Sequence, residues 1–139
     1  MNAENQSPIR IAADGTWYFN DSEMFRLEAV SFLASRLHRS DGGYAITLGP
    51  QTLPILVEDV PFVIKSVSTT ENGWEAVLAD GRTVALPPGE VQLVGDTPYF
   101  SLFSEWDSKF SRAAFWHITA FLVEREGRQF LDEPASAAG

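Results

Sequence analysis

The most apolar stretch of the chain runs from Leu53 to Val67 and reads LPILVEDVPFVIKSV. It contains two short runs of β-branched and aromatic residues, separated by an acidic pair and Pro61. Runs of this length, bounded by prolines on one side and Asn-Gly on the other, favour strands over a buried helix. Proline has no amide hydrogen, so Pro61 belongs at a sheet edge or a corner. The pattern therefore predicts two strands joined by a bend over residues 58–61.

Further short apolar runs are separated by turn signals. Asp14-Gly15 separates residues 9–13 from residues 16–19 and predicts a hairpin. After the central stretch, Asn72-Gly73 and Asp80-Gly81 separate residues 74–78 and 82–86. Strands and turns at this spacing predict an antiparallel meander, with a further strand at residues 91–94.

Two segments have the helical period. In the first, Asn20 and Glu23 have the form of a capping box, and apolar residues recur from Met24 to Leu37 before Asp41-Gly42-Gly43. The second is expected to be capped by Ser104 with Asp107 and to extend to about Arg125. It is apolar on nearly every side, which indicates a buried helix or a subunit interface.

The two helical segments align with each other at an offset of 85 residues. The alignment pairs Val30 with Phe115 and Leu37 with Leu122, and it places Asp41-Gly42 opposite Glu126-Gly127. We therefore expect an α+β protein of two repeated helix-plus-antiparallel-sheet modules. The expected divisions are a disordered N-terminus (1–8), an N-terminal helix-and-sheet module (9–60), a C-terminal meander-plus-helix module (61–131) and a disordered tail (132–139).

Charge and composition exclude several classes of function. The net charge of −9, with ten scattered Lys and Arg residues, disfavours nucleic-acid binding. The chain has no cysteine and only two histidines, so no metal site or cofactor is expected. Its sequence shows no signal peptide and no apolar stretch long enough to span a membrane, so we predict a cytoplasmic protein.

Three segments carry a resemblance to a known family. The central VEDVPFVI, the upstream DGTWYFN at residues 14–20 and DGGYAIT at residues 41–47 resemble the bacterial family of unknown function DUF1285. The resemblance extends from about Ile9 to Leu131 and implies a duplicated unit whose C-terminal half is similar to a small pleckstrin-homology-like (PH-like) barrel. It also implies a nucleotide-like ligand between the two halves and a role in signal transduction. The chain departs from the family pattern at residues 47–51 and 79–81.

The first functional hypothesis is a non-catalytic ligand-binding or regulatory protein. A cleft between repeated modules is a usual location for a small ligand. Arginines near helix N-termini are suited to an anion, and aromatic rings provide stacking surfaces. The alternative for each arginine is an ion pair with one of the surplus carboxylates. The candidate ligand-binding residues are Trp17, Arg26, Tyr44, Glu58, Asp59, Lys65 and Arg112.

Two other hypotheses assign the protein to different functional classes. An enzyme is disfavoured, because the chain has no nucleophile elbow, phosphate loop or metal-ligand spacing, and we expect no catalytic residue. Glu58 and Asp59 would point to opposite faces of an extended strand, so we interpret them instead as carboxylates that fix the corner. Gly95 to Pro98 is interpreted as a plain turn. The remaining alternative is a protein-interaction subunit, a homodimer or partner-binding protein that uses the apolar second helix.

Overall fold

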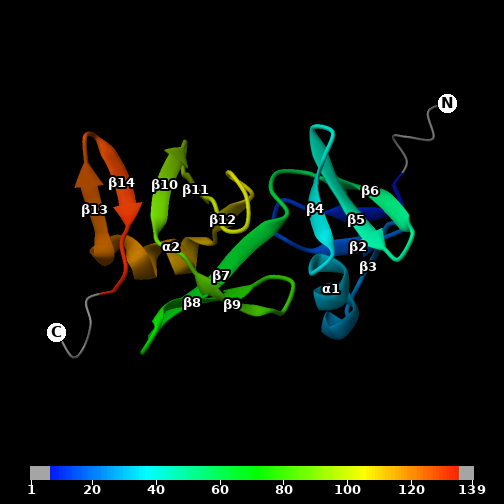
Figure 1. The fold of residues 1–139 in the computed structure, drawn as a ribbon, viewed down its shortest axis with the longest axis horizontal. Helices are drawn as coiled ribbons and strands as arrows, with labels where there is room; N and C mark the ends of the chain where they lie inside the picture. The colour runs from blue at the N-terminus through cyan, green and yellow to red at the C-terminus, as the bar shows by residue number, and fades with distance from the viewer. Residues whose placement is uncertain (1–6, 135–139) are drawn as a thin grey trace. The chain divides into compact units, whose positions relative to one another are not determined.

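The computed structural model describes residues 7–134, which form two compact units divided between Pro61 and Phe62. The protein is mostly β, with two mixed sheets of six and eight strands and two short helices (Figure 1). The predicted disorder at residues 1–6 and 135–139 lies outside the described range. Ser7 and Asp132 are hydrogen-bonded, because the Ser7 hydroxyl donates to the carbonyl of Pro54 and the Asp132 carbonyl accepts from the indole of Trp74.

The first unit contains one six-stranded sheet and one helix. Its elements are β1 (Ile9–Ile11), β2 (Trp17–Phe19), β3 (Ser22–Glu23), α1 (Leu27–Ala34), β4 (Leu37–Ser40), β5 (Gly43–Leu48) and β6 (Gln51–Val57). The strand order is β3-β2-β1-β6-β5-β4. The predicted hairpin at Asp14-Gly15 is confirmed, since β1 and β2 are antiparallel partners. The prediction of a purely antiparallel sheet is wrong, because β1 and β6 pair in parallel.

The core of the first unit lies between the sheet and α1. Val30 and Ala34 are the buried residues of α1, and they pack with Ile11, Trp17 and Ile46. These side chains are at most 3% exposed. The four-residue spacing of Val30 and Ala34 places both on one helix face, so the amphipathic pattern positions α1 on the sheet.

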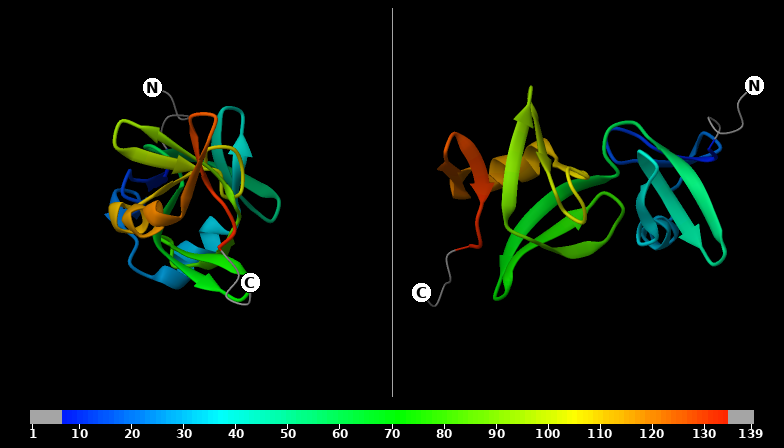
Figure 2. Two further views of the ribbon diagram at one scale, coloured as in Figure 1. Left: turned by 90° about the vertical axis from the view of Figure 1, so that its left-hand side faces the viewer. Right: turned by 45° about the horizontal axis from the view of Figure 1, so that its top comes forward.

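The second unit contains one eight-stranded sheet and one helix. Its elements are β7 (Phe62–Thr70), β8 (Gly73–Leu78), β9 (Thr83–Leu86), β10 (Gly89–Val94), β11 (Thr97–Phe100), β12 (Ser108–Phe110), α2 (Arg112–Ile118), the 3-10 turn η2 (Thr119–Phe121), β13 (Leu122–Arg125) and β14 (Arg128–Leu131). The strand order is β13-β14-β10-β11-β12-β7-β8-β9. Figure 2 shows the long, twisted hairpin of β7 and β8 in green.

The predicted meander of β7, β8 and β9 and the bend before it are confirmed. The described strands do not close into the PH-like barrel implied by the resemblance, because the sheet has β13 at one edge and β9 at the other. It is also mixed, since β12 and β7 are parallel. The bend itself, residues 58–61, separates the strands of the two units.

Both helices are shorter than predicted. Asn20 and Asp21 have φ angles of 49° and 67° and form the turn between β2 and β3, so Asn20 does not cap a helix. Leu37 to Ser40, predicted to be helical, pairs with β5 as strand β4. The backbone of those residues therefore pairs with β5, and the helical period of the apolar residues in the sequence does not reveal this pairing.

The second helix begins eight residues after its predicted cap. The carboxylate of Asp107 is fully buried and accepts hydrogen bonds from the amides of Leu102, Phe103 and Ser104, so it organises a loop. The N-cap of α2 is instead Ser111, whose hydroxyl accepts from the amide of Ala114 at 3.1 Å. Residues 122–125, also predicted to be helical, form strand β13.

The segment from α1 to β5 reappears, 85 residues later, as the segment from α2 to β14. The pairing of Leu37 with Ile46 becomes that of Leu122 with Leu131, and the rest of the hairpin keeps this register. The turns correspond as well, with φ angles of 43° and 81° at Asp41-Gly42 and of 52° and 78° at Glu126-Gly127.

The buried faces of the two helices follow a different offset. Val30 and Ala34 correspond to Ala114 and Ile118, which is an offset of 84. The predicted alignment at 85 therefore holds for the hairpins and for the first residue of each helix, and it is wrong by one residue for the helix face that packs on each sheet.

Candidate functional site

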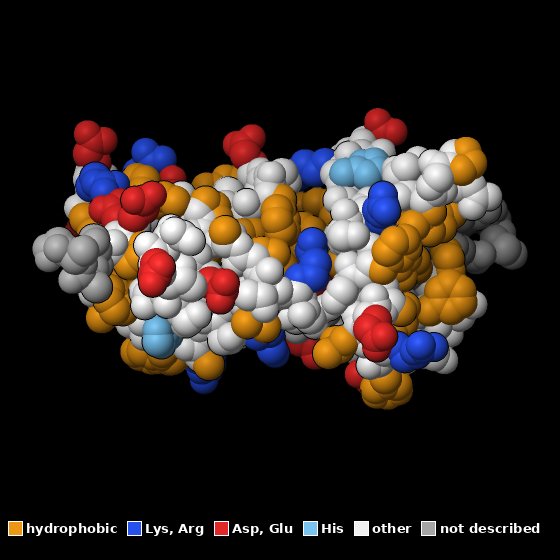
Figure 3. Space-filling model, turned by 60° about the horizontal axis from the view of Figure 1, so that its bottom comes forward, with side chains coloured by type: hydrophobic (Ala, Val, Ile, Leu, Met, Phe, Trp, Pro, Cys, Tyr) orange, Lys and Arg blue, Asp and Glu red, His pale blue; other side chains and the backbone are white. Residues whose placement is uncertain are grey.

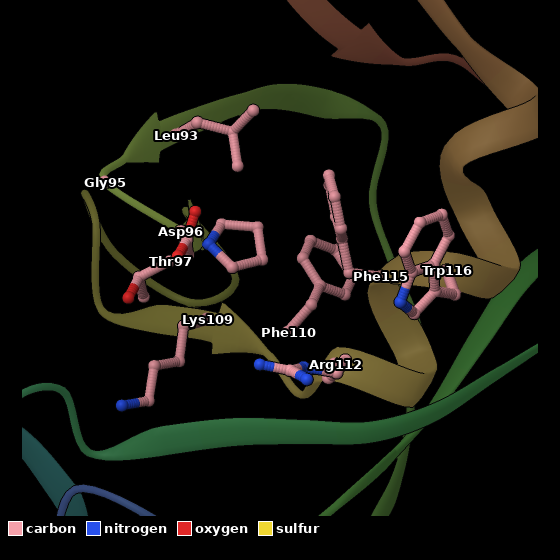
Figure 4. A pocket seen from close by; sticks show the side chains of 10 residues that line it. Leu93, Gly95, Asp96, Thr97, Lys109, Phe110, Arg112, Phe115 and Trp116 are labelled. Atoms are coloured by element: carbon pink, nitrogen blue, oxygen red, sulfur yellow. The ribbon is translucent and has the colours of Figure 1, made fainter.

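A cavity of about 580 Å³ lies within the second unit. Its walls come from the β10–β11 hairpin, from β12 and from α2 (Figure 4). This volume is within the range of about 300–1,000 Å³ that is typical of small-molecule sites. We regard it as the candidate functional site.

One wall of the cavity is apolar. Pro98 and Phe110 are buried, Phe115 is half-buried, and Leu93 and Trp116 are largely exposed. The edge of Phe110 packs on Phe100 at a centroid distance of 5.2 Å, so the floor of the cavity is fixed by the core. Trp116 is 69% exposed, which leaves its indole available to stack on a bound molecule.

Two cations border this apolar wall. Lys109 on β12 lines the cavity beside Phe110 and has an interaction partner. Ser111 then caps α2, and Arg112 is the first residue of the helix. In Figure 4 the side chains of Lys109 and Arg112 extend along the same side of the cavity. Within residues 7–134, Arg112 has no ion-pair or hydrogen-bond partner.

The opposite end of the cavity is the turn between β10 and β11. Val94 pairs with Thr97, so Gly95 and Asp96 form a two-residue loop. Gly95 has a φ angle of 62°, in the left-handed region that residues with a side chain rarely adopt. Asp96 follows it. It is exposed and is one of the residues that line the cavity.

This arrangement is suited to binding an amphipathic anion. A guanidinium can form two parallel hydrogen bonds with a carboxylate or phosphate, and the aromatic wall can cover an apolar group. Among the residues that line the cavity, Asp96 and Thr97 carry oxygen atoms in their side chains, but none is a histidine or cysteine that could act as a nucleophile or a base near neutral pH.

The predicted site residues of the first unit lie at separate places. Trp17 is 2% exposed and belongs to the core, so it offers no free face for stacking. Tyr44 is half-buried on β5, with the guanidinium of Arg39 at 5.2 Å from the centre of its ring. Arg26 is exposed at the N-cap of α1.

Glu58 has the structural role that the sequence analysis favours. Its carboxylate accepts a hydrogen bond from Arg10 at 2.6 Å and another from the amide of Ala13 at 3.2 Å. These contacts tie the end of β6 to β1. Asp59 beside it is exposed and also has an interaction partner.

The other two predicted residues, Lys65 and Arg112, are close along the backbone of the second unit. The carbonyl of Lys65 accepts a hydrogen bond from the Ser111 hydroxyl at 3.1 Å, next to Arg112. Of the seven predicted residues, only Arg112 lines the cavity. A ligand site between the two modules stays a prediction.

Sequence reasoning missed most of the cavity. The segment at Gly95 to Pro98 was expected to be a plain turn, yet it forms one end of the cavity. Lys109 and Arg112 were not considered as a pair, because the helix was expected to begin near Ser104. The signal that could have indicated this pair is the sequence Lys-Phe-Ser-Arg, in which two cations flank an apolar residue and a serine.

Other kinds of site can be assessed from the same residues. His38 is engaged by the carbonyl of Arg39 and the hydroxyl of Thr47, and His117 is exposed on α2. In the described chain, no three His, Asp or Glu side chains gather in a way that could hold a metal ion. No helix in residues 7–134 is long and apolar enough to cross a membrane. Figure 3 shows Lys and Arg side chains scattered among acidic ones over the face in view.

Comparisons with known proteins find a family match for the first unit and a similar fold for most of the chain. Residues 2–60 match the family described as "Domain of unknown function (DUF1285), N-terminal domain". Two solved structures have a similar fold, both of them DUF1285 family proteins with 20% sequence identity to this chain. The one from Shewanella baltica OS155 has a TM-score of 0.72 and covers 82% of this chain and 91% of its own.

The other structure, from Silicibacter pomeroyi DSS-3, has a TM-score of 0.69 and covers 87% of this chain and 72% of its own. No curated protein matches the chain. Residues 2–60, which contain the DGTW, DGGY and VEDV segments, therefore belong to the DUF1285 N-terminal domain family, and most of the chain shares the fold of two DUF1285 family proteins.

Proposed function

We propose that this protein is a non-catalytic ligand-binding or regulatory protein and that the cavity of the second unit holds a small anionic ligand with a flat apolar part. The observation that carries the proposal is the position of Arg112, which has no partner in the described chain and lies beside an aromatic wall. An arginine held in this way has its five N–H donors available for an anion. A nucleotide-like molecule is one member of this ligand class, and a role in cytoplasmic signalling would follow from it.

A thermal-shift screen against nucleoside monophosphates and aromatic carboxylates tests this proposal. A ligand at one hundred times its dissociation constant adds about 2.7 kcal/mol to the free energy of unfolding. For a chain of this length, that corresponds to an increase of roughly 5–10 °C in the melting temperature.

Two variants make the screen specific to the cavity. Arg112→Ala should abolish the shift without lowering the melting temperature of the free protein, because no described interaction is lost. Arg26→Ala removes the same charge from the N-terminal end of the other helix and should leave the shift intact. A flat screen, or an equal loss in both variants, would refute a site in this cavity.

A second candidate function is protein interaction. It is favoured by the exposure of Trp116 and Phe121, which are 69% and 47% exposed on α2 and η2. Size-exclusion chromatography with light scattering should then show a dimer, and Trp116→Ser should return it to the monomer. A monomer at all concentrations would contradict the homodimer.

A further inference from the structure

The charges that line the cavity do not have one sign. Lys109 and Arg112 border the apolar wall, and Asp96 lies on the β10–β11 turn at the other end. Lys109 already has an interaction partner, so the charged side chains left for a ligand are Arg112 and Asp96, one of each sign. Figure 4 shows Asp96 and Thr97 on the turn, separate from the guanidinium of Arg112.

The acid and the arginine do not satisfy each other. Within residues 7–134, the carboxylate of Asp96 has no hydrogen-bond or ion-pair partner, and the same is true of the guanidinium of Arg112. Both groups line a single cavity and remain open to a ligand. A ligand that carried only negative charge would meet repulsion from Asp96, whereas one that also carried a cation would find a partner at each end.

From this distribution we propose that the ligand is a zwitterion with a large apolar group, namely an α-amino acid with an aromatic or long aliphatic side chain. This inference rests on the proposed function and narrows it. The carboxylate of the ligand would bind Arg112, its ammonium group would bind Asp96 and the Thr97 hydroxyl, and its side chain would lie against Phe115 and Trp116. One available cation and one available carboxylate are better matched to a zwitterion than to a phosphate dianion.

Three probes separate the contributions of the two charges. L-tryptophan carries both charges, indole-3-propionate lacks only the amino group, and tryptamine lacks only the carboxylate. Titration calorimetry with the full chain should give the tightest binding for L-tryptophan, with each analogue weaker by roughly two- to fivefold, because the ion pair that each analogue lacks is with an exposed side chain. NMR shifts of the Gly95 and Lys109 amides locate the binding.

Variants assign each charge to its side chain. Asp96→Asn should remove the preference for L-tryptophan over indole-3-propionate. Arg112→Gln should weaken the binding of both molecules to the same extent. Arg26→Gln in the first unit is the matched control and should change neither.

Adenosine monophosphate is included as a probe of the wider ligand class. If indole-3-propionate or adenosine monophosphate bound at least as tightly as L-tryptophan, the zwitterion inference would be overturned while the proposed function survived. If neither these two molecules nor L-tryptophan or L-leucine bound, both would fail.

Discussion

Replacing Asp107 by alanine should destabilise the second unit more than any other single loss of a polar side chain in it. The Asp107 side chain is fully buried and accepts hydrogen bonds from the amides of Leu102, Phe103 and Ser104 at 2.8, 3.0 and 2.9 Å. It also accepts one from the Ser108 hydroxyl at 2.7 Å. The loop that precedes β12 thus has its backbone donors satisfied by one carboxylate.

The magnitude follows from the donors that the change leaves unpaired. A buried donor without a partner costs about 1–3 kcal/mol. The amide of Leu102 is the most deeply buried of the three, whereas those of Phe103 and Ser104 lie nearer to water and regain part of their hydrogen bonding. We therefore expect Asp107→Ala to lower the free energy of unfolding by about 3–5 kcal/mol, a large part of the 5–15 kcal/mol of a typical protein.

Urea denaturation followed by tryptophan fluorescence measures this loss, with Trp106 adjacent to the changed residue. Asp107→Asn keeps the size of the side chain but turns an amide NH₂ toward backbone donors, so most of the loss should remain. Ser104→Ala is the control, because it keeps the Ser104 amide that donates to the carboxylate and removes a hydroxyl whose contact with the carboxylate is long, at 3.4 Å. A loss below about 1 kcal/mol for Asp107→Ala would refute the assignment of this loop's stability to the carboxylate.

Three further outcomes are expected. Gly42→Ala and Gly127→Ala should each cost about 1–2 kcal/mol by urea denaturation, because both glycines have a positive φ angle and no atom lies within 4 Å of the added carbon; unequal losses would contradict the equivalence of the two turns. Ser111→Ala should lower the free energy of unfolding by about 1 kcal/mol through loss of the N-cap of α2, and an unchanged urea midpoint would count against that role. The hydrogen bond from Arg128 lowers the pKa of Glu90 below its ordinary value of 4.5, so the pair adds stability above pH 4.5 that is lost as the pH falls through the lowered pKa. Glu90→Gln should accordingly reduce the melting temperature at pH 7, and the reduction should shrink as the pH is lowered below 4.5; a reduction that did not change with pH would contradict the ion pair.

Local patterns determined the turns and most of the strands. Asp14-Gly15, Asn72-Gly73 and Asp80-Gly81 each end one strand and begin the next, because few residues other than glycine adopt the required backbone angles. The proline at position 61 likewise marks the boundary between the strands of the two units. The correspondence between the turns Asp41-Gly42 and Glu126-Gly127 could be recognised in the sequence for the same reason, since each ends in a glycine with a positive φ angle.

The helix ends could not be read in this way, because they depend on pairings between distant residues. Leu37 and Leu122 continue an apolar helical period, yet both begin strands because β5 and β14 provide partners. The capping pattern of Ser104 and Asp107 is present in the sequence, but the carboxylate serves the loop amides instead of a helix.

The sequence by itself determined the turns, most of the strands, the repeat and the family resemblance. Only the tertiary structure decided that Trp17 is in the core, that Glu58 binds Arg10, and that Asp96 and Arg112 line one cavity. The physical reason is that turn chemistry acts over two to four residues, whereas burial and charge pairing depend on which distant strands the fold brings together.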